Sequence, residues 1–433
     1  MYIEKIDSPA DVKILSVEQM EILAGEIRQA LLHKLSEHGG HIGLNLGMVE
    51  ATIALHYVFS SPHDKIVYDV SHQSYTHKIL TGRKGAFLNA ADYDKVSGYT
   101  NPQESEHDFF TIGHTSTSVS LACGLVKARD LKGGNENIIA VIGDGSLSGG
   151  EAYEGLSNAG ENGTNMIIVV NDNEMSIAEE HAVALASGIA AGGGKPVYGV
   201  YSSFIQRSYD QLSQDLCINN NPATIVVFMG TIAGMNDETH LGFFDIPLIC
   251  NIPNMVYLAP TCKEEYFAML KWSIHQHEHP VAIRVPGASV VSGNLDFDTD
   301  YSDLNRYKLV QKGEKVAILG LGAFYGLGES VAKLLKEECG VEATLINPRY
   351  ITGLDVEMLE ELKRSHSLVV TLEDGELDGG FGEKIARFYG SSDVKVLNYG
   401  VRKEFADRYI TEELLKANRL TDVQIVEDIR KYW

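Results

Sequence analysis

The chain has 433 residues, which is enough for two or three domains with hydrophobic cores of their own. Its formal net charge of −23 argues against nucleic acid and against an anionic membrane surface as partners. The five cysteines are scattered without a CxxC pair, no apolar run reaches membrane-spanning length, and the polar N-terminus does not resemble a signal peptide. We therefore expect a cytoplasmic protein with reduced thiols, no zinc site and no membrane segment.

Helices and strands are expected to alternate from the start of the chain. Ser16, with Gln19 at the capping-box position, predicts the beginning of a long amphipathic helix. A second helix is expected over residues 49–59, followed by an apolar strand that ends in His72. Residues 82–105 are polar and contain Gly, Asn and Pro, so they predict a loop on the surface.

Two predicted parallel strands then end in polar turns. Strand 138–142 stops at the sequence GDG (143–145), and strand 166–170 stops at the sequence NDN (171–173), with a helical pattern between them. Parallel strands joined by a helix place their carboxyl ends at the same edge of a sheet, where open α/β sheets bind ligands. The carboxylate of Asp144, the carboxamides and the glycine turns suit a hard divalent cation that carries a diphosphate.

Three histidines occupy predicted turns near the same edge: His41, His72 and His114. Each histidine alone would be explained by a capping or solvated surface role, whereas the three together favour a functional cluster. The sequence around His114, TIGHTSTS, leads into a small-residue helix over residues 118–128. Hydroxyls and backbone N–H groups at the start of a helix are suited to binding an anion.

The middle of the chain continues the alternation of strands and helices, which predicts a further parallel sheet. The expected elements are a helix that begins at Glu179, strand 196–201, helix 204–216, strand 223–228, helix 263–277 and strand 281–285. A glycine-bounded loop, 234–242, carries Asp237 and His240. Residues 287–307 are rich in Ser, Asp and Asn and are expected to form a linker.

The last part, from residue 315 onwards, repeats the α/β pattern as a separate unit. Its expected elements are strand 316–322, helix 328–336, strands 343–346 and 367–374, helix 382–388 and strand 394–400. The glycine turn GLGAFYG invites a dinucleotide interpretation, but Tyr325 stands where the third glycine of that motif belongs. A pyridine-nucleotide oxidoreductase is therefore a weak alternative.

These motifs resemble those of thiamine diphosphate enzymes of the transketolase superfamily, and in particular its 1-deoxy-D-xylulose-5-phosphate synthase branch. The similar stretches are the GDG…N motif, NDNEMSI, DVSHQSYTHKILTGR, GHTSTS, IAEEHAV, YSSFIQRSYDQ and LEDGELDGGFG. The resemblance implies a transketolase-like α/β fold of successive parallel-sheet domains with helices on both faces, and a homodimer. It implies a diphosphate- and magnesium-binding domain at 1–176, a pyrimidine-binding domain at 177–300 and a transketolase C-terminal domain at 307–433, the first two abbreviated.

The resemblance also implies roles for individual residues. Magnesium is expected on Asp144, Asn173 and the backbone carbonyl of Met175. The residues expected to contact thiamine diphosphate are His72, Gly113, His114, Thr115, Gly145, Ser146, Asn173, Glu179 and Phe204. Those expected to take part in catalysis are Glu179, which would hydrogen-bond the aminopyrimidine ring, and His41, His72 and His240. Without the resemblance, Glu179 would be explained as an acid at a helix start, and Phe204 and Met175 as ordinary core.

The activity implied is transfer of a two-carbon unit from a keto acid or ketose donor to an aldehyde acceptor. This would be either decarboxylative carboligation of pyruvate, as in 1-deoxy-D-xylulose-5-phosphate synthase, or transketolase-type ketol transfer. The alternative is a cofactor-binding or scaffold protein whose catalysis is impaired by a shortened chain.

One departure from the family is a missing segment. NDNEMS runs directly into IAEEHAV, so a piece of roughly 100 residues or more is absent between Met175 and Glu179. The six residues from Asn173 to Glu179 span at most about 20 Å when extended. The sheets are abbreviated, or Glu179 serves a cofactor held by another subunit, or the chain has been shortened artificially.

A second departure concerns the substrate. The family grips its phosphorylated aldehyde with two arginines, but the corresponding residues here are Met229 and Gly287. Each lost hydrogen bond to a charged group removes about 1.5–3 kcal/mol. Arg284 remains, but it lies within a predicted strand, away from the turn where phosphate would bind. We therefore expect an acceptor other than glyceraldehyde 3-phosphate.

Overall fold

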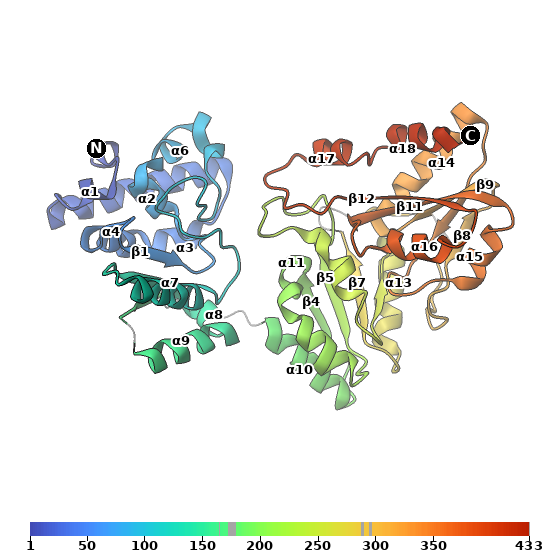
Figure 1. Cartoon of the computed structure of the whole chain (residues 1–433), viewed down its shortest axis with the longest axis horizontal. Coiled ribbons are helices and arrows are strands. Elements are labelled where there is room, and N and C mark those ends of the chain that lie inside the picture. Colours follow the sequence, from blue (N-terminus) through green and yellow to red (C-terminus); the bar gives the residue numbers. More distant parts are fainter. Residues whose placement is uncertain (164, 172–178, 287–289, 294–296, 433) are drawn as a thin grey trace. The chain divides into compact units, whose positions relative to one another are not determined.

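The computed structural model describes residues 1–163, 165–171, 179–286, 290–293 and 297–432. The chain divides into two compact units, Met1–Ala178 and Glu179–Trp433. Figure 1 shows the elements of both units. Among these described ranges, no helix has both the length and the apolar character needed to cross a membrane.

The first unit is built on a three-stranded parallel sheet in the order β1-β2-β3. The strands are β1 Lys65–Tyr68, β2 Ile138–Gly143 and β3 Ile167–Asn171. The helices are α1 Pro9–Val12, α2 Val17–His38, α3 Ile42–Gly47, α4 Val49–Val58, α5 Tyr75–Lys78, α6 Gly85–Leu88, α7 Ser118–Lys132, α8 Asp144–Leu147 and α9 Gly150–Asn162.

Helices cover both faces of this sheet. On the central strand β2, Ile139 and Val141 belong to a core with Leu55 of α4, while Ala140 belongs to a core with Val126 of α7 on the opposite face. Burial on both faces explains why β2 is a continuous apolar run rather than an alternating pattern. The strands predicted to end at 142 and 170 end one residue later, β2 at Gly143 and β3 at Asn171.

The N-terminus of α2 is formed as predicted. The Ser16 hydroxyl accepts a hydrogen bond from the Gln19 N–H, and the Gln19 side chain accepts one from the Ser16 N–H. The prediction that the first strand ends in His72 is wrong. β1 stops at Tyr68 because Val70 and Ser71 adopt positive φ angles of 54° and 68°, which end the extended backbone.

The segment 82–105 is not a surface loop, and that prediction is wrong as well. Phe87, Tyr93 and Tyr99 are each 7% exposed or less. The segment also contains Arg83 and Glu104, whose charged groups lie in a buried network of ion pairs. Because that network joins residues far apart along the chain, it leaves no local apolar pattern in the sequence.

The second unit contains a four-stranded parallel sheet and a five-stranded mixed sheet, in the orders β4-β5-β7-β6 and β12-β11-β9-β10-β8. The strands are β4 Val197–Tyr201, β5 Thr224–Phe228, β6 Val256–Leu258, β7 Val281–Val285, β8 Lys308–Gln311, β9 Lys315–Gly320, β10 Thr344–Asn347, β11 His366–Glu376 and β12 Lys395–Val401. The helices are α10 Glu179–Ala191, α11 Ser202–Ile205, α12 Asp245–Ile249, α13 Lys263–His275, α14 Tyr325–Cys339, α15 Val356–Leu362, α16 Phe381–Tyr389, α17 Thr411–Ala417 and α18 Asp422–Ile429.

The four-stranded sheet also has helices on both faces. In β5, Val227 packs in a core with Val183 of α10, whereas Val226 packs in a core with Met269 of α13. The first of these cores continues into the five-stranded sheet, where it includes Leu319. The predicted α/β fold with parallel sheets is therefore confirmed, and within this unit the two sheets share a core.

Two other predictions for this unit need correction. The expected helix 204–216 is broken into α11, a 3₁₀ turn at Gln206–Ser208 and a π-helical turn at Gln211–Cys217. The expected linker 287–307 lies partly outside the described residues, and the remainder is not a simple linker. Tyr301 is 1% exposed, and its ring packs edge-on against Trp272 at 5.9 Å between centroids.

Candidate functional site

The candidate metal site lies at the carboxyl edge of the first sheet. β2 and β3 are neighbours, with Gly143 paired to Asn171, so the turns that follow both strands begin side by side. Asp144, the first residue after β2, is half-buried. The other predicted ligands, Asn173 and Met175, lie outside the described residues. In the described part of the chain, no group of three or more His, Cys, Asp or Glu side chains could hold a metal.

The predicted anion-binding turn at 113–115 lies beside the turn after β2. The Asp69 carboxylate accepts hydrogen bonds from the Ser116 and Ser118 N–H groups, both at 2.8 Å. The Ser116 hydroxyl donates to the Ser146 carbonyl at 2.6 Å, and a Cβ atom at Gly149 would overlap the Ser116 side chain. These contacts bring Gly113, His114 and Thr115 close to Gly145 and Ser146.

His41 and His72 lie next to each other, as the clustering of histidines predicted. Their ring centroids are 5.1 Å apart and the ring planes are nearly perpendicular, at 89°. A fully buried amide, Asn45, holds both residues, since its Nδ2 donates to the His41 carbonyl at 2.6 Å and to the His72 carbonyl at 2.8 Å. Its Oδ1 accepts the Tyr75 N–H at 3.0 Å. The sequence analysis missed Asn45, although it lies only four residues after His41.

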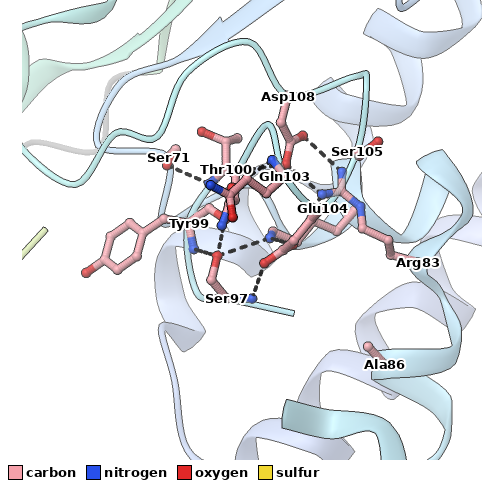
Figure 2. Close-up of polar contacts among 12 residues, drawn as sticks. Ser71, Arg83, Ala86, Ser97, Tyr99, Thr100, Gln103, Glu104, Ser105 and Asp108 are labelled. Carbon is pink, nitrogen blue, oxygen red and sulfur yellow. Dashed lines mark hydrogen bonds and ion pairs between the residues drawn. The ribbon is translucent and has the colours of Figure 1, made fainter. Parts of the chain in front are cut away.

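A tyrosine that was also missed completes this group of rings. The Tyr99 ring meets the His41 ring at 5.6 Å with an interplanar angle of 65°. The neighbouring residue, Thr100, donates its N–H to the Ser71 hydroxyl at 2.9 Å (Figure 2). That hydroxyl donates to the Ile112 carbonyl at 2.7 Å. Ser71 therefore connects the turns that carry His72, Tyr99 and His114.

The remaining predicted site residues belong to the second unit. Glu179 is the first residue of α10, as expected, although the structure does not describe its side chain. Phe204 follows the carboxyl end of β4, and its ring meets the His240 ring edge-on at 5.5 Å. The second unit thus brings Phe204 and His240 together at the carboxyl edge of its parallel sheet.

The loop around His240 is held by polar contacts. Thr239 Oγ1 lies 2.8 Å from His240 Nδ1, and the Thr239 N–H donates to Asp237 at 2.9 Å. Burial would raise the pKa of Asp237, but its interactions with His240 and Thr239 outweigh that effect and lower the pKa. Asp237 therefore keeps its negative charge, three positions before His240 in the chain.

A C-terminal segment also fastens this loop. The Arg408 N–H donates to the Asn236 carbonyl at 2.6 Å, and the Asn236 amide donates to the Tyr409 carbonyl at 3.0 Å. The Tyr409 hydroxyl donates to the Ile232 carbonyl at 2.7 Å. The position of the loop that carries His240 therefore depends on residues more than 160 positions later in the chain.

The arginine that remains near the predicted phosphate position is engaged inside the protein. Arg284 is 4% exposed, pairs with Asp245 at 2.7 Å and donates to the Asp374 carbonyl at 2.5 Å. Met229 follows β5 directly, and Gly287 lies outside the described residues. As expected from its place in β7, the guanidinium group of Arg284 binds other residues of the protein, Asp245 and the Asp374 carbonyl.

A cavity of about 230 Å³ lies beyond the carboxyl ends of β5 and β7. Its lining includes Thr231, Thr261, Pro286, Asp374 and Thr411, and none of the described residues that line it is Lys, Arg or His. Burial raises the pKa of Asp374 to about 6. A cavity with hydroxyls and a buried acid, and without a cation in its described lining, does not suit a phosphate group.

The chain was compared with known protein families, curated relatives and solved structures. A family model described as 1-deoxy-D-xylulose-5-phosphate synthase matches residues 3–217. Models of the transketolase pyrimidine-binding domain and the transketolase C-terminal domain match residues 170–290 and 305–425. A solved structure titled "Split gene transketolase, inactive beta4 tetramer" matches with a TM-score of 0.53 and 22% identity, covering 72% of this chain and 96% of that one. At this identity the structural match supports the fold alone.

Curated relatives named 1-deoxy-D-xylulose-5-phosphate synthase match nearly the whole chain. The relative from Symbiobacterium thermophilum is 30% identical, with 94% of this chain and 91% of the relative covered. The relative from Pelotomaculum thermopropionicum is 29% identical, with 99% and 96% covered.

The relatives are longer than this chain. The first alignment spans 593 positions, 160 more than the 433 residues of this chain, so at least that many positions have no counterpart here. The first two family models overlap over 170–217, across the junction where the sequence departs from the family. With a family model for each part of the chain and relatives that cover nearly all of it, the chain belongs to the 1-deoxy-D-xylulose-5-phosphate synthase family of transketolase-like, thiamine diphosphate-dependent transferases.

Proposed function

We propose that this chain transfers a two-carbon unit from a keto acid or ketose donor to an aldehyde acceptor, with thiamine diphosphate and Mg²⁺ as cofactors. The observation that carries the proposal is the convergence of three turns at one edge of the first sheet. Asp144 lies at this edge, Ser116 directly after the turn at 113–115 is bonded to Ser146, and His41 lies against His72. Family membership supports the same chemistry.

A magnesium-bound diphosphate would take one ligand from the described residues, Asp144, and two from residues outside them. Asp144 supplies a carboxylate oxygen of the kind that Mg²⁺ prefers, and Asn173 with the Met175 carbonyl would complete the protein ligands. The residues that would donate hydrogen bonds to the diphosphate are Gly113, His114, Thr115, Gly145 and Ser146. Backbone N–H groups and hydroxyls in such turns satisfy phosphate oxygens.

The residues of the second unit would hold the other end of the cofactor. Glu179 would hydrogen-bond the aminopyrimidine ring and Phe204 would pack against it. When bound, thiamine diphosphate supplies an electron sink that no side chain of this protein offers. The three histidines His41, His72 and His240 would orient the donor and acceptor and move protons at their carbonyl and hydroxyl oxygens.

For the assembly we propose a homodimer in which each site combines both kinds of unit. Residues 1–176, 177–300 and 307–433 would act as diphosphate-binding, pyrimidine-binding and C-terminal domains. The cytoplasmic location expected from the cysteine pattern stays a prediction.

The acceptor we propose is an aldehyde without a phosphate group. Met229 stands at one family arginine position, Arg284 is paired with Asp245, and the cavity beyond β5 and β7 contains the buried acid Asp374. D-Glyceraldehyde should therefore be used with a higher kcat/KM than its 3-phosphate, because no described cation of the cavity compensates the phosphate charge. The two acceptors are compared with pyruvate as donor by following product formation. Efficient formation of deoxyxylulose phosphate would contradict this prediction.

Calorimetry tests the proposed function directly. The chain is titrated with thiamine diphosphate in the presence of Mg²⁺, and pyruvate consumption is then followed with an added aldehyde. We expect binding and turnover, and a loss of binding in Asp144→Ala, since the metal would lose a ligand. Glu154→Ala, which removes an exposed acid in the middle of α9, is the control. Binding without turnover would favour the scaffold alternative, and the absence of binding would refute the proposal.

A further inference from the structure

Four charged side chains of the first unit form a buried group that takes no part in the site described above. This group, the ion cluster, consists of Lys78, Arg83, Glu104 and Asp108. Arg83 binds Asp108 through two hydrogen bonds of 2.6 and 3.0 Å, and Lys78 binds Glu104 at 2.5 Å. The four side chains are between 0% and 11% exposed. Such buried ion pairs add little net stability, so their presence is better explained by the conformation that they impose.

The acid at the centre of the ion cluster remains charged. Burial would raise the pKa of Asp108, but hydrogen bonds from His77 and Arg83 outweigh burial and hold the pKa well below its usual range. His77 lies 2.9 Å from Asp108, and His56 continues the chain of contacts at 2.9 Å from His77. Burial lowers the pKa of both histidines. The Asp108 carboxylate therefore keeps its negative charge across the neutral pH range.

The two acids of the ion cluster hold the ends of a short backbone segment, 97–101. The Ser97 N–H donates to Glu104 at 2.6 Å, and the Asn101 N–H donates to Asp108 at 2.8 Å. Figure 2 shows the bond between Ser97 and Glu104. Since a charged acceptor binds an N–H more strongly than a neutral one, both ends of the segment are firmly placed.

Tyr99 lies in the middle of this segment, and its ring extends away from the charged groups (Figure 2). It is 7% exposed and meets the His41 ring, which in turn meets the His72 ring. A Cβ atom at Gly98 would lie 4.0 Å from His41 Nδ1, so the backbone also passes close to this imidazole. Edge-to-face contacts favour one relative orientation of two rings. The orientation of an imidazole decides which nitrogen faces a substrate.

We propose that Tyr99 is a positioning residue that sets the orientation of the His41 imidazole, and that the ion cluster holds Tyr99 in place. The proposal rests on the proposed function, in which His41 acts on the substrate. It assigns a role to a tyrosine and four charged residues for which the sequence analysis gave none. The two cations of the ion cluster, Lys78 and Arg83, lie within the twelve residues that begin at His72, whereas its two acids come from the segment that follows Tyr99.

The first test compares Tyr99→Phe, which keeps the ring, with Tyr99→Ala, which removes it. We expect Tyr99→Phe to retain kcat/KM within about twofold and Tyr99→Ala to lose about tenfold to a hundredfold, because a misplaced catalytic group costs that much. Thiamine diphosphate affinity should not change in either variant. Tyr57→Ala removes an exposed tyrosine of the same unit and serves as the control. Equal activity of Tyr99→Ala and wild type would overturn the proposal.

A second readout does not depend on turnover. In the cofactor-free protein with ¹³C-labelled histidine, the His41 signal is identified by its loss in His41→Gln. Tyr99→Ala should shift this signal, because the ring current of the tyrosine is lost, and should leave the exposed His275 signal in place. Tyr99→Phe, which keeps an aromatic ring, should leave the His41 signal at its wild-type position. An unshifted His41 signal in Tyr99→Ala would overturn the proposal, whereas an inactive wild type with the expected shifts would refute only the proposed function.

The proposed role of the ion cluster in holding Tyr99 is tested with Asp108→Asn, which keeps the shape of the side chain and removes its charge. We expect the same shift of the His41 signal as in Tyr99→Ala. If Asp108→Asn fails to fold, Glu104→Gln tests the other end of the segment, since it weakens the bond to the Ser97 N–H. A folded Asp108→Asn or Glu104→Gln variant with an unchanged His41 signal would overturn the role of the ion cluster.

Discussion

Asn45 is a buried side chain whose hydrogen bonds all end on backbone atoms. It joins the carbonyls of His41 and His72 and the N–H of Tyr75, which come from two segments about 30 residues apart. The Asp69 carboxylate likewise holds the turn that follows Ile112, because it accepts hydrogen bonds from the Ser116 and Ser118 N–H groups. At the scale of single residues, buried side chains that bind the backbone decide where the predicted histidines lie.

Asn45→Ala should destabilise the first unit and separate the two histidines. It leaves two carbonyls and one N–H buried without this partner, at about 1–3 kcal/mol for each group. We expect the midpoint of urea unfolding to fall clearly, and kcat to fall in the folded fraction. Asn135→Ala, an exposed asparagine, should leave both unchanged. A variant with wild-type stability would contradict this account of Asn45.

Glu373 is a third buried residue that binds the backbone, at the start of α16. Its carboxylate accepts the Phe381 and Gly382 N–H groups, each at 2.7 Å, and it is fully buried. Burial raises the pKa of Glu373 to about 7 in spite of these two hydrogen bonds. The folded chain therefore binds a proton at Glu373 at pH values where the unfolded chain has released it.

This raised pKa predicts a pH dependence of stability. The contribution of Glu373 is fully present below its ordinary pKa of 4.5 and is lost as the pH rises through about 7. Glutamine at this position stays neutral at every pH. The stability of Glu373→Gln relative to wild type should therefore be greater at about pH 8 than at about pH 5. Thermal unfolding of both proteins at the two pH values measures this, with the exposed Glu337→Gln as control. A Tm difference that does not change with pH would refute the raised pKa.

At the scale of elements, the C-terminal part of the chain completes a loop of the middle part. Three hydrogen bonds join residues 408–409 to Ile232 and Asn236, in the segment that leads to His240. The five-stranded sheet and its helices lie on a core that continues from the four-stranded sheet. The C-terminal elements therefore act on the site through the loop, without supplying a predicted site residue.

Tyr409→Phe should loosen this loop while leaving the fold intact. It removes one hydrogen bond, worth about 1 kcal/mol, and leaves the Ile232 carbonyl without that donor. We expect a loss of about threefold to tenfold in kcat, with thiamine diphosphate affinity unchanged, because His240 is displaced rather than removed. Tyr153→Phe, an exposed tyrosine, should behave like wild type. Unchanged kcat in Tyr409→Phe would show that the segment does not position the loop.

At the scale of the whole molecule, the residues expected at one cofactor belong to two compact units. Asp144 and the histidines 41, 72 and 114 lie in the first, and Glu179, Phe204 and His240 in the second. Glu179 follows Asn173 by only six positions along the chain. The homodimer proposed above, in which each site would take one unit from each subunit, is compatible with this short connection, since the units of one chain would not need to serve the same cofactor.

Mixing two inactive variants tests the shared site. Asp144→Ala damages the first unit and Glu179→Gln the second, so a mixed dimer contains one site with both defects and one intact site. After joint unfolding and refolding we expect about a quarter of the wild-type activity from the mixture and almost none from either variant alone. Light scattering should give about twice the chain mass of 47.4 kDa. A monomer that binds thiamine diphosphate would exclude the shared site.

Signals that are local along the chain determined much of this protein. Apolar runs predicted β2, β3, β5 and β7 to within one residue at each end, the capping pattern at Ser16 predicted the start of α2, and Glu179 was placed correctly at the start of α10. The family, its fold and its chemistry also followed from motifs in the sequence. The roles of the individual site residues stay predictions.

Only the tertiary structure decided which residues support the site. Asn45 meets His72 across 27 positions, His77 meets Asp108 across 31, and Tyr409 meets Ile232 across 177. Contacts of this kind leave no periodic pattern, so the segment 82–105 was misjudged as a surface loop. The physical reason is that secondary structure depends on neighbours along the chain, whereas a buried polar group is placed by partners that only the folded chain brings within hydrogen-bonding distance.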